Sequence, residues 1–222
     1  MIRMTRVEVA TVVLSLALLP SGGRAQSGAG GGEVLRRAET LYAGVRTLCA
    51  DFVQELEVPL LRESHSGRGR LCQSRPDRFA MRFSEPAGDL VIADGTSVWR
   101  YLPSQDPRQA FRVPMEGGAG TVDLHRQFLQ DPQTKYVIAD EGTDTLGGRT
   151  VHRIRLTPRA PSSFVAAVVW IGSGDALLYR VRVEEENGTV RTITLQEIEA
   201  NRSVPDGFFS FQPPAGVHVI QR

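Results

Sequence analysis

From Ala50 onward, apolar and polar side chains alternate with a period of two, and this pattern constrains the fold more than any other feature of the chain. In the first alternating stretch, Phe52, Leu56 and Val58 fall on one face and Asp51 falls on the other. Successive side chains of a strand point to opposite faces of a sheet, so the pattern predicts a strand with one buried face. The chain is therefore expected to be mainly β.

Further strands are predicted by similar stretches at residues 69–75, 78–83, 90–93, 97–101, 151–156, 164–171, 177–183 and 190–198. Asp94-Gly95 and Asn187-Gly188 are typical of tight hairpin turns between such strands. The stretch 164–171 is almost continuously apolar and is expected to be covered on both faces. Because no strand–helix–strand alternation occurs, we expect one domain built on an antiparallel sheet that curls into a barrel or sandwich.

Helical spacing of apolar residues is confined to two places. Residues 34–48 predict an amphipathic helix of about four turns ahead of the first strand. A second, short helix is expected near residues 122–130, after a loop rich in Pro, Gly and Asp.

The first 25 residues are typical of a secretory signal peptide. Arg3 and Arg6 form a basic start, an apolar run covers residues 9–19, and small residues lead to Ala25. That run is too short to span a bilayer. Gln26 follows where a lipid-anchored protein would carry Cys. We expect export, with residues 1–25 as signal peptide, 26–32 as a flexible leader and 33–222 as a single domain.

Charge and cysteine content narrow the function. The formal net charge is +1 and no basic patch with interleaved aromatics is present, so no nucleic-acid partner is expected. Two cysteines, Cys49 and Cys72, occur in the exported part, and an oxidising compartment favours a disulfide between them.

Catalytic patterns are missing from the sequence. The four histidines have no metal-ligand spacing; they are His65, His125, His152 and His218. No nucleophile elbow occurs, and neither cysteine has a recognisable His partner. We therefore expect no catalytic residues, no metal and no cofactor, although an enzyme assembled from distant positions on a barrel stays an alternative.

A series of short segments follows in a characteristic order: Ala50-Asp51-Phe52-Val53-Gln54, Gly69-Arg70-Leu71, Arg75-Pro76-Asp77-Arg78-Phe79, Ala93-Asp94-Gly95, Val98-Trp99-Arg100-Tyr101 and Phe208-Phe209-Ser210-Phe211-Gln212-Pro213-Pro214. In this order and spacing, which hold from about Val34 to Val219, the chain resembles the outer-membrane lipoprotein carrier protein family (LolA-like proteins). It departs from the family in carrying Cys49 and Cys72 and a Pro/Asp-rich stretch at 103–107.

The resemblance implies a mainly β fold with α: a strongly curved, incomplete antiparallel β-barrel covered by a helical lid. It implies a monomeric periplasmic carrier that takes acylated lipoproteins from an inner-membrane lipoprotein-releasing ABC transporter to the outer membrane, where a receptor accepts them. The family's Arg-Pro-x-x-Phe segment supplies an arginine that latches barrel to lid and a phenylalanine in the region that meets the transporter. These positions correspond to Arg75 and Phe79.

A carrier of this kind needs an apolar lining, because exposing an acyl chain to water costs about 0.8 kcal/mol per methylene. The candidates for this lining are Phe52, Leu56, Phe79, Met81, Phe83, Ile92, Trp99 and Tyr179. Ordinary core packing is the alternative for each of them. We expect the guanidinium of Arg75 to bond backbone carbonyls of the lid and to give way when lipid enters; a solvated surface arginine is the alternative.

Three other functions stay open. A periplasmic sensor module of the same barrel class would bind lipid, lipoprotein or another protein without transporting it. An outer-membrane receptor would need an acylated N-terminal Cys, which Gln26 does not provide. The third is the enzyme named above.

Overall fold

The computed structural model describes residues 30–115 and 123–221. The expected signal peptide, residues 1–25, lies outside the described residues. Positions 26–29 of the expected leader, and Val122 at the start of the expected short helix, also lie outside them.

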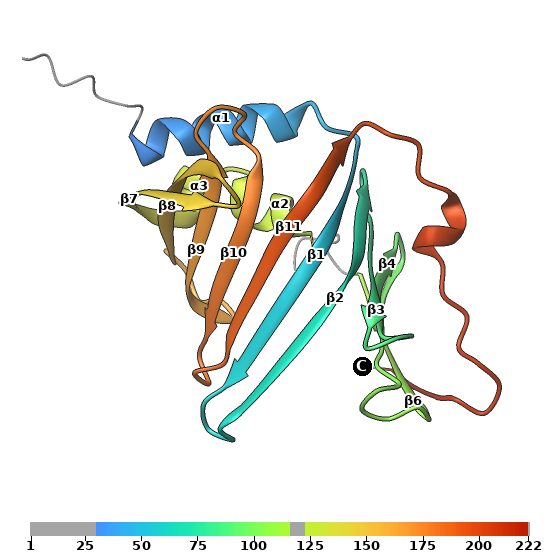
Figure 1. Cartoon of the computed structure of the whole chain (residues 1–222). Helices are drawn as coiled ribbons and strands as arrows, with labels where there is room; N and C mark the ends of the chain where they lie inside the picture. The colour runs from blue at the N-terminus through green and yellow to red at the C-terminus, as the bar shows by residue number, and fades with distance from the viewer. Residues whose placement is uncertain (1–29, 116–122, 222) are drawn as a thin grey trace, which may run out of the picture.

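Within these ranges, twelve strands form one continuous sheet in the order β12-β6-β5-β4-β3-β2-β1-β11-β10-β9-β8-β7. Their bounds are β1 Thr47–Val58, β2 Glu63–Ser74, β3 Arg78–Glu85, β4 Leu90–Asp94, β5 Ser97–Tyr101, β6 Gln109–Pro114, β7 Tyr136–Leu146, β8 Arg149–Pro158, β9 Phe164–Gly172, β10 Leu178–Glu185, β11 Val190–Ala200 and β12 His218–Gln221. The sheet is strongly curved, and β12 and β7 lie at its two ends, so the barrel is open (Figure 1). The expected mainly β fold, an incomplete barrel with a helical lid, is confirmed.

The predicted hairpins are present. Gly95, between β4 and β5, and Gly188, between β10 and β11, have φ values of 101° and 80°, which glycine adopts without strain. The predicted strand over 164–171 is β9, and nearly all of it is buried on both faces, as expected.

Three strands, β6, β7 and β12, are not predicted by the local pattern. β6 follows the Pro/Asp-rich stretch and pairs with β5, while β12 comes from the far end of the chain and pairs with β6. The pairing of β12 with β6 is parallel, so the sheet is not antiparallel throughout. β12 is stabilised by a partner distant in sequence, which local propensity does not report, whereas β6 and β7 pair with the neighbouring strands β5 and β8.

In the described part of the chain, four short helical segments accompany the sheet: α1 Gly31–Ala43, α2 Leu124–Leu129, α3 Pro132–Lys135 and the 3₁₀ helix η2 Asp206–Phe209. α1 lies across one end of the sheet (Figure 1). It begins within the expected leader, because the N–H of Gly31 donates to the Oδ2 atom of Asp140 in β7. It ends at Ala43, whereas the expected helix ran to residue 48. Leu48 continues the apolar spacing of the helix, but it belongs to β1 and its side chain is buried there.

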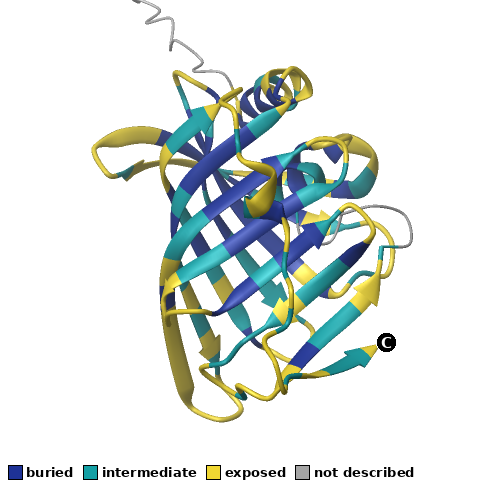
Figure 2. Ribbon diagram, turned by 90° about the vertical axis from the view of Figure 1, so that its right-hand side faces the viewer, coloured by how far each residue is buried: buried dark blue, intermediate teal, exposed yellow. Residues whose placement is uncertain are grey.

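The sheet is covered on both faces, and Figure 2 shows buried segments along most of its strands. On the helix-covered face, α1 and α2 pack over a cluster that includes Phe52, Leu71 and Phe79. On the other face, residues 201–217, which we call the C-terminal strap, place Phe209 against Cys72 and Ile92. Polar–apolar alternation therefore does not separate core from solvent in this sheet.

Candidate functional site: an apolar cavity beneath the helices

A cavity of about 320 Å³ lies between the sheet and α2. It is built from β3, β4, β9, β10, β11 and α2, which meet only in the folded chain. Its apolar lining consists of Phe79, Met81, Val91, Leu124, Phe164, Val181, Val183 and Ile193. A concave, mainly apolar site of this volume is typical of small-ligand pockets.

Polar side chains complete the cavity at the β10–β11 turn. Glu185 and Arg191, which we call the cavity rim, approach each other with Nη2 3.5 Å from Oε1. Arg191 is exposed, so the cavity meets solvent there. An apolar interior with a charged edge suits a ligand that has an apolar chain and a polar end.

Five of the eight predicted lining residues lie on the helix-covered face. Phe79 and Met81 line the cavity, with 3% and 6% of their surface exposed. Phe52 and Phe83 pack edge to face beside it, with ring centroids 4.9 Å apart. Leu56 is half-buried and follows Phe52 on the same face of β1.

Ile92 and Trp99 do not line the cavity, and the prediction that they do is wrong. The register pairs Met81 with Val91, which places Val91 in the lining and turns Ile92 to the opposite face. Trp99 pairs with Ile92 and packs there against Phe211 of the strap, with centroids 5.7 Å apart. Burial under the strap, and not contact with the cavity, accounts for the apolar side chains at these two positions.

Tyr179 also lies away from the cavity. The β9–β10 register shifts between Leu178 and Arg180, and this irregularity breaks the alternation that would place Tyr179 on the same face as Val181. Tyr179 packs instead with Val151 and its hydroxyl donates to Asp175 Oδ2 at 2.6 Å. The prediction for Tyr179 is therefore wrong as well.

Several lining residues are not among the candidates drawn from the sequence. They are Val91, Leu124, Phe164, Val181, Val183 and Ile193. Val181 and Val183 stand in the recognised alternation of β10, so the sequence carries a signal for them. The alternation alone does not show which face of the sheet α2 covers.

Arg75 lies where β2 ends beside the end of α1. Its Nη2 atom donates to the carbonyl oxygen of Tyr42, and its Nη1 atom donates to that of Ala43 at 3.4 Å. Carbonyls in the last turn of a helix lack intrahelical partners, and a cation there is favoured by the helix dipole. The guanidinium thus links the sheet to the C-terminal end of α1.

His125 of α2 packs beneath the same end of α1. Its ring lies 4.2 Å from the ring of Tyr42, and Nδ1 is 2.7 Å from Oε1 of Gln73 in β2. Among the described residues its Nε2 atom has no hydrogen-bond partner. Burial lowers the pKa of His125 to about 4; Asp123 opposes this shift and Arg75 adds to it. His125 is therefore neutral at pH 7.

Tyr42 connects these groups. Its hydroxyl accepts the N–H of Leu178 in β10 at 3.0 Å, while its carbonyl accepts from Arg75 and its ring contacts His125. One residue of α1 is thus held by β10, by α2 and by the end of β2.

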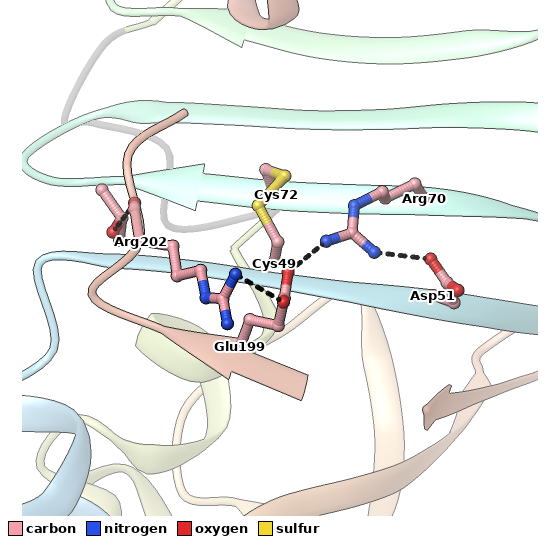
Figure 3. Close-up of polar contacts among 7 residues, drawn as sticks. Cys49, Asp51, Arg70, Cys72, Glu199 and Arg202 are labelled. Atoms are coloured by element: carbon pink, nitrogen blue, oxygen red, sulfur yellow. Dashed lines mark hydrogen bonds and ion pairs between the residues drawn. A yellow bond between two sulfur atoms is a disulfide. The ribbon is translucent and has the colours of Figure 1, made fainter. Parts of the chain in front are cut away.

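Cys49 and Cys72 face each other across β1 and β2, with sulfur atoms 2.04 Å apart. Figure 3 shows the polar residues beside this disulfide. Arg70 donates to Asp51 Oδ1 at 2.8 Å and to Glu199 Oε2 at 2.6 Å, which ties β2 to β1 and β11. This network lies on the strap-covered side and braces three central strands.

Over residues 30–115 and 123–221, no group of three or more His, Cys, Asp or Glu side chains could hold a metal ion. In those same ranges, no helix has both the length and the apolar character needed to cross a membrane.

Comparison with known proteins gives a consistent family signal. The family model for "Outer membrane lipoprotein carrier protein LolA" matches residues 43–113. A protein of Ralstonia nicotianae named outer-membrane lipoprotein carrier protein is 26% identical over 219 residues, covering 96% of each chain. One of the same name from Chromobacterium violaceum is 24% identical over 183 residues, covering 82% of this chain and 84% of the other.

Solved structures resemble the fold. An uncharacterized conserved protein from Thermus thermophilus superposes with a TM-score of 0.53 at 17% identity, covering 86% of this chain and 98% of that one. MucB superposes with a TM-score of 0.50 at 13% identity, covering 82% of this chain and 62% of MucB. At these identities the likeness concerns the fold alone.

Proposed function

We propose that the chain, which is similar to the LolA-like outer-membrane lipoprotein carriers, belongs to that family and holds the acyl chains of lipoproteins in the cavity beneath α2. The observation that carries this proposal is an apolar cavity with a charged rim, covered by helices. We further propose that the chain works in the periplasm and does not catalyse a reaction. Its donor is an inner-membrane ABC transporter and its destination is the outer membrane.

Energetics favour a sheltered route. A chain of about fifteen carbons costs on the order of 12 kcal/mol to expose to water. The cavity of about 320 Å³ lies at the small end of ligand sites, so cargo requires the helices to move outward. Phe79 is only 3% exposed, and its proposed contact with a transporter therefore also requires this opening.

A charge placed in the cavity tests the proposal. Val183→Arg puts a guanidinium into the apolar lining, and we expect the affinity for a fluorescent acylated peptide to fall by about tenfold or more, since an unpaired charge resists burial. Fluorescence titration measures the effect. Val165→Arg is the matched control, because Val165 is 50% exposed. If both variants bind the peptide as tightly as the unaltered protein, the cavity is not the acyl-chain site.

Arg75→Leu tests the latch. The change removes both guanidinium contacts with the last turn of α1, so the closed form loses stability relative to the open one. We expect the protein to fold, to bind acylated peptide at least as tightly, and to release it several times more slowly to an acceptor. Arg36→Leu, on the same helix with its side chain 63% exposed, is the control. Normal release by Arg75→Leu contradicts the latch.

A further inference from the structure

The β1–β2 hairpin carries two leucines that stand out into solvent. Leu60 is 80% exposed and Leu61 is 65% exposed, the largest values among the large hydrophobic residues of the described chain. They lie in the turn between two twelve-residue strands, at the end of the sheet opposite α1 (Figure 1). We call residues 59–62 the β1–β2 tip.

The tip is a closed turn in which two backbone N–H groups are paired. The N–H of Leu61 donates to the carbonyl of Val58 at 3.0 Å, and the N–H of Arg62 donates to that of Pro59 at 3.1 Å. Pro59 has no N–H and its φ is restricted by the ring. Backbone groups that are paired internally can enter an apolar medium at lower cost than free ones. The turn therefore presents two leucines outward with part of its backbone already paired.

The tip lies at the same end of the sheet as the cavity rim. Leu56 of β1 pairs with Arg191 of β11, and Glu57 pairs with Val190. Beyond these pairs β1 runs on into the tip, while β11 begins at the turn that carries Glu185. A surface touched by the two leucines is thus near the place where the cavity meets solvent.

Charge beside the tip limits which surface it suits. Glu55, Glu57 and Glu63 are exposed on the two strands. The exposed basic groups beside them are Arg62 in the turn and Arg191 opposite Leu56, and His65 lies 3.3 Å from Glu63. These carboxylates are repelled by an anionic surface. A surface of low net charge does not repel them, so the leucines can contact it.

From these observations we propose that the β1–β2 tip docks the protein, weakly and reversibly, on a lipid surface of low net charge. Leu60 and Leu61 enter the interfacial region, and the cavity rim is brought close to the lipid from which an acyl chain arrives or to which it leaves. The role of the rim in this step rests on the proposed carrier function. Docking itself depends only on the tip.

The test is flotation with vesicles of phosphatidylcholine and with vesicles that also contain phosphatidylglycerol. We expect the unaltered protein to float with the neutral vesicles, and the doubly substituted Leu60→Ser/Leu61→Ser protein to lose about tenfold or more of that partitioning. At low salt, partitioning to the anionic vesicles should be weaker and should rise with added salt. Val137→Ser/Val165→Ser, whose valines are 51% and 50% exposed, is the matched control.

Several outcomes would overturn the proposal. If the Leu60/Leu61 and Val137/Val165 variants float equally, the tip does not dock the protein on lipid. Stronger binding to anionic than to neutral vesicles at low salt contradicts the charge argument. If the unaltered protein ignores all vesicles while the tip variant fails to receive cargo from membranes, the tip serves a protein partner and the lipid proposal is wrong. Binding of acylated peptide in the absence of vesicles tests the cavity separately. If the unaltered protein floats with vesicles but does not bind the peptide, the carrier function is rejected and docking stays supported.

Discussion

Replacing Cys49 and Cys72 together with alanine is expected to lower the free energy of unfolding by about 3.4 kcal/mol. The two residues are 23 positions apart, and the bond restricts the unfolded chain over that loop. Both side chains are buried between the strap and the sheet, so the bond also fixes β1 against β2 where Phe209 packs. Urea unfolding of the variant and the unaltered protein measures the difference.

Reduction separates the covalent effect from the change in side-chain volume. In dithiothreitol the unaltered protein should lose most of the same stability, while the doubly substituted protein should not respond. The m-value should rise, because an uncrosslinked chain exposes more surface on unfolding. Identical urea midpoints for the unaltered protein with and without reductant would contradict a stabilising disulfide.

Lowering the pH from 7 to 4 is expected to destabilise the fold through His125 by about 3 kcal/mol. The pKa of this side chain is about 4 in the folded protein, against an ordinary value of 6.5. The unfolded state therefore takes up the proton first as the pH falls. The stability that His125 confers is complete above pH 6.5, declines as the pH falls towards 4, and is lost below it.

His125→Phe isolates this contribution. Phenylalanine keeps a ring against Tyr42 but cannot titrate, so the slope of stability against pH between 6.5 and 4 should flatten although stability at pH 7 falls. Phe128→Leu, which alters a buried ring of the same helix that cannot titrate, should lower stability without changing the slope. Amide protection factors of α1 and α2, corrected for the intrinsic exchange rate at each pH, should fall in the same pH range in the unaltered protein. A steep slope that survives in His125→Phe would show that other groups carry the acid sensitivity.

The disulfide and His125 illustrate different limits of sequence-based prediction. The number of cysteines and their compartment predict a bond between Cys49 and Cys72, and the register of β1 and β2 places the two residues opposite each other. The sequence carries no such signal for His125. Its environment is created by Tyr42 of α1 and Gln73 of β2, which only the fold brings together.

Three local patterns in the sequence determined the larger part of the architecture. Alternation gave most strands, turn residues gave the hairpins at Gly95 and Gly188, and apolar spacing at helical period gave two helical segments. These features are local, because a strand's period and a turn's φ values are set by neighbouring residues. The segments around Arg75 and Phe79 likewise carry the resemblance to the LolA-like family in the order of residues alone.

Only the tertiary structure decided which apolar face serves the cavity. A period of two sorts side chains into two faces but does not say what covers each, and here the helices cover one face and the strap covers the other. Trp99 and Phe79 therefore look alike in sequence although they lie on opposite sides. The edge pairing of β12 with β6 and the carbonyl partners of Arg75 also depend on segments distant in the chain, whose contacts local sequence does not encode. The displacement of Tyr179 follows from a register irregularity between the neighbouring strands β9 and β10, which the alternation does not reveal.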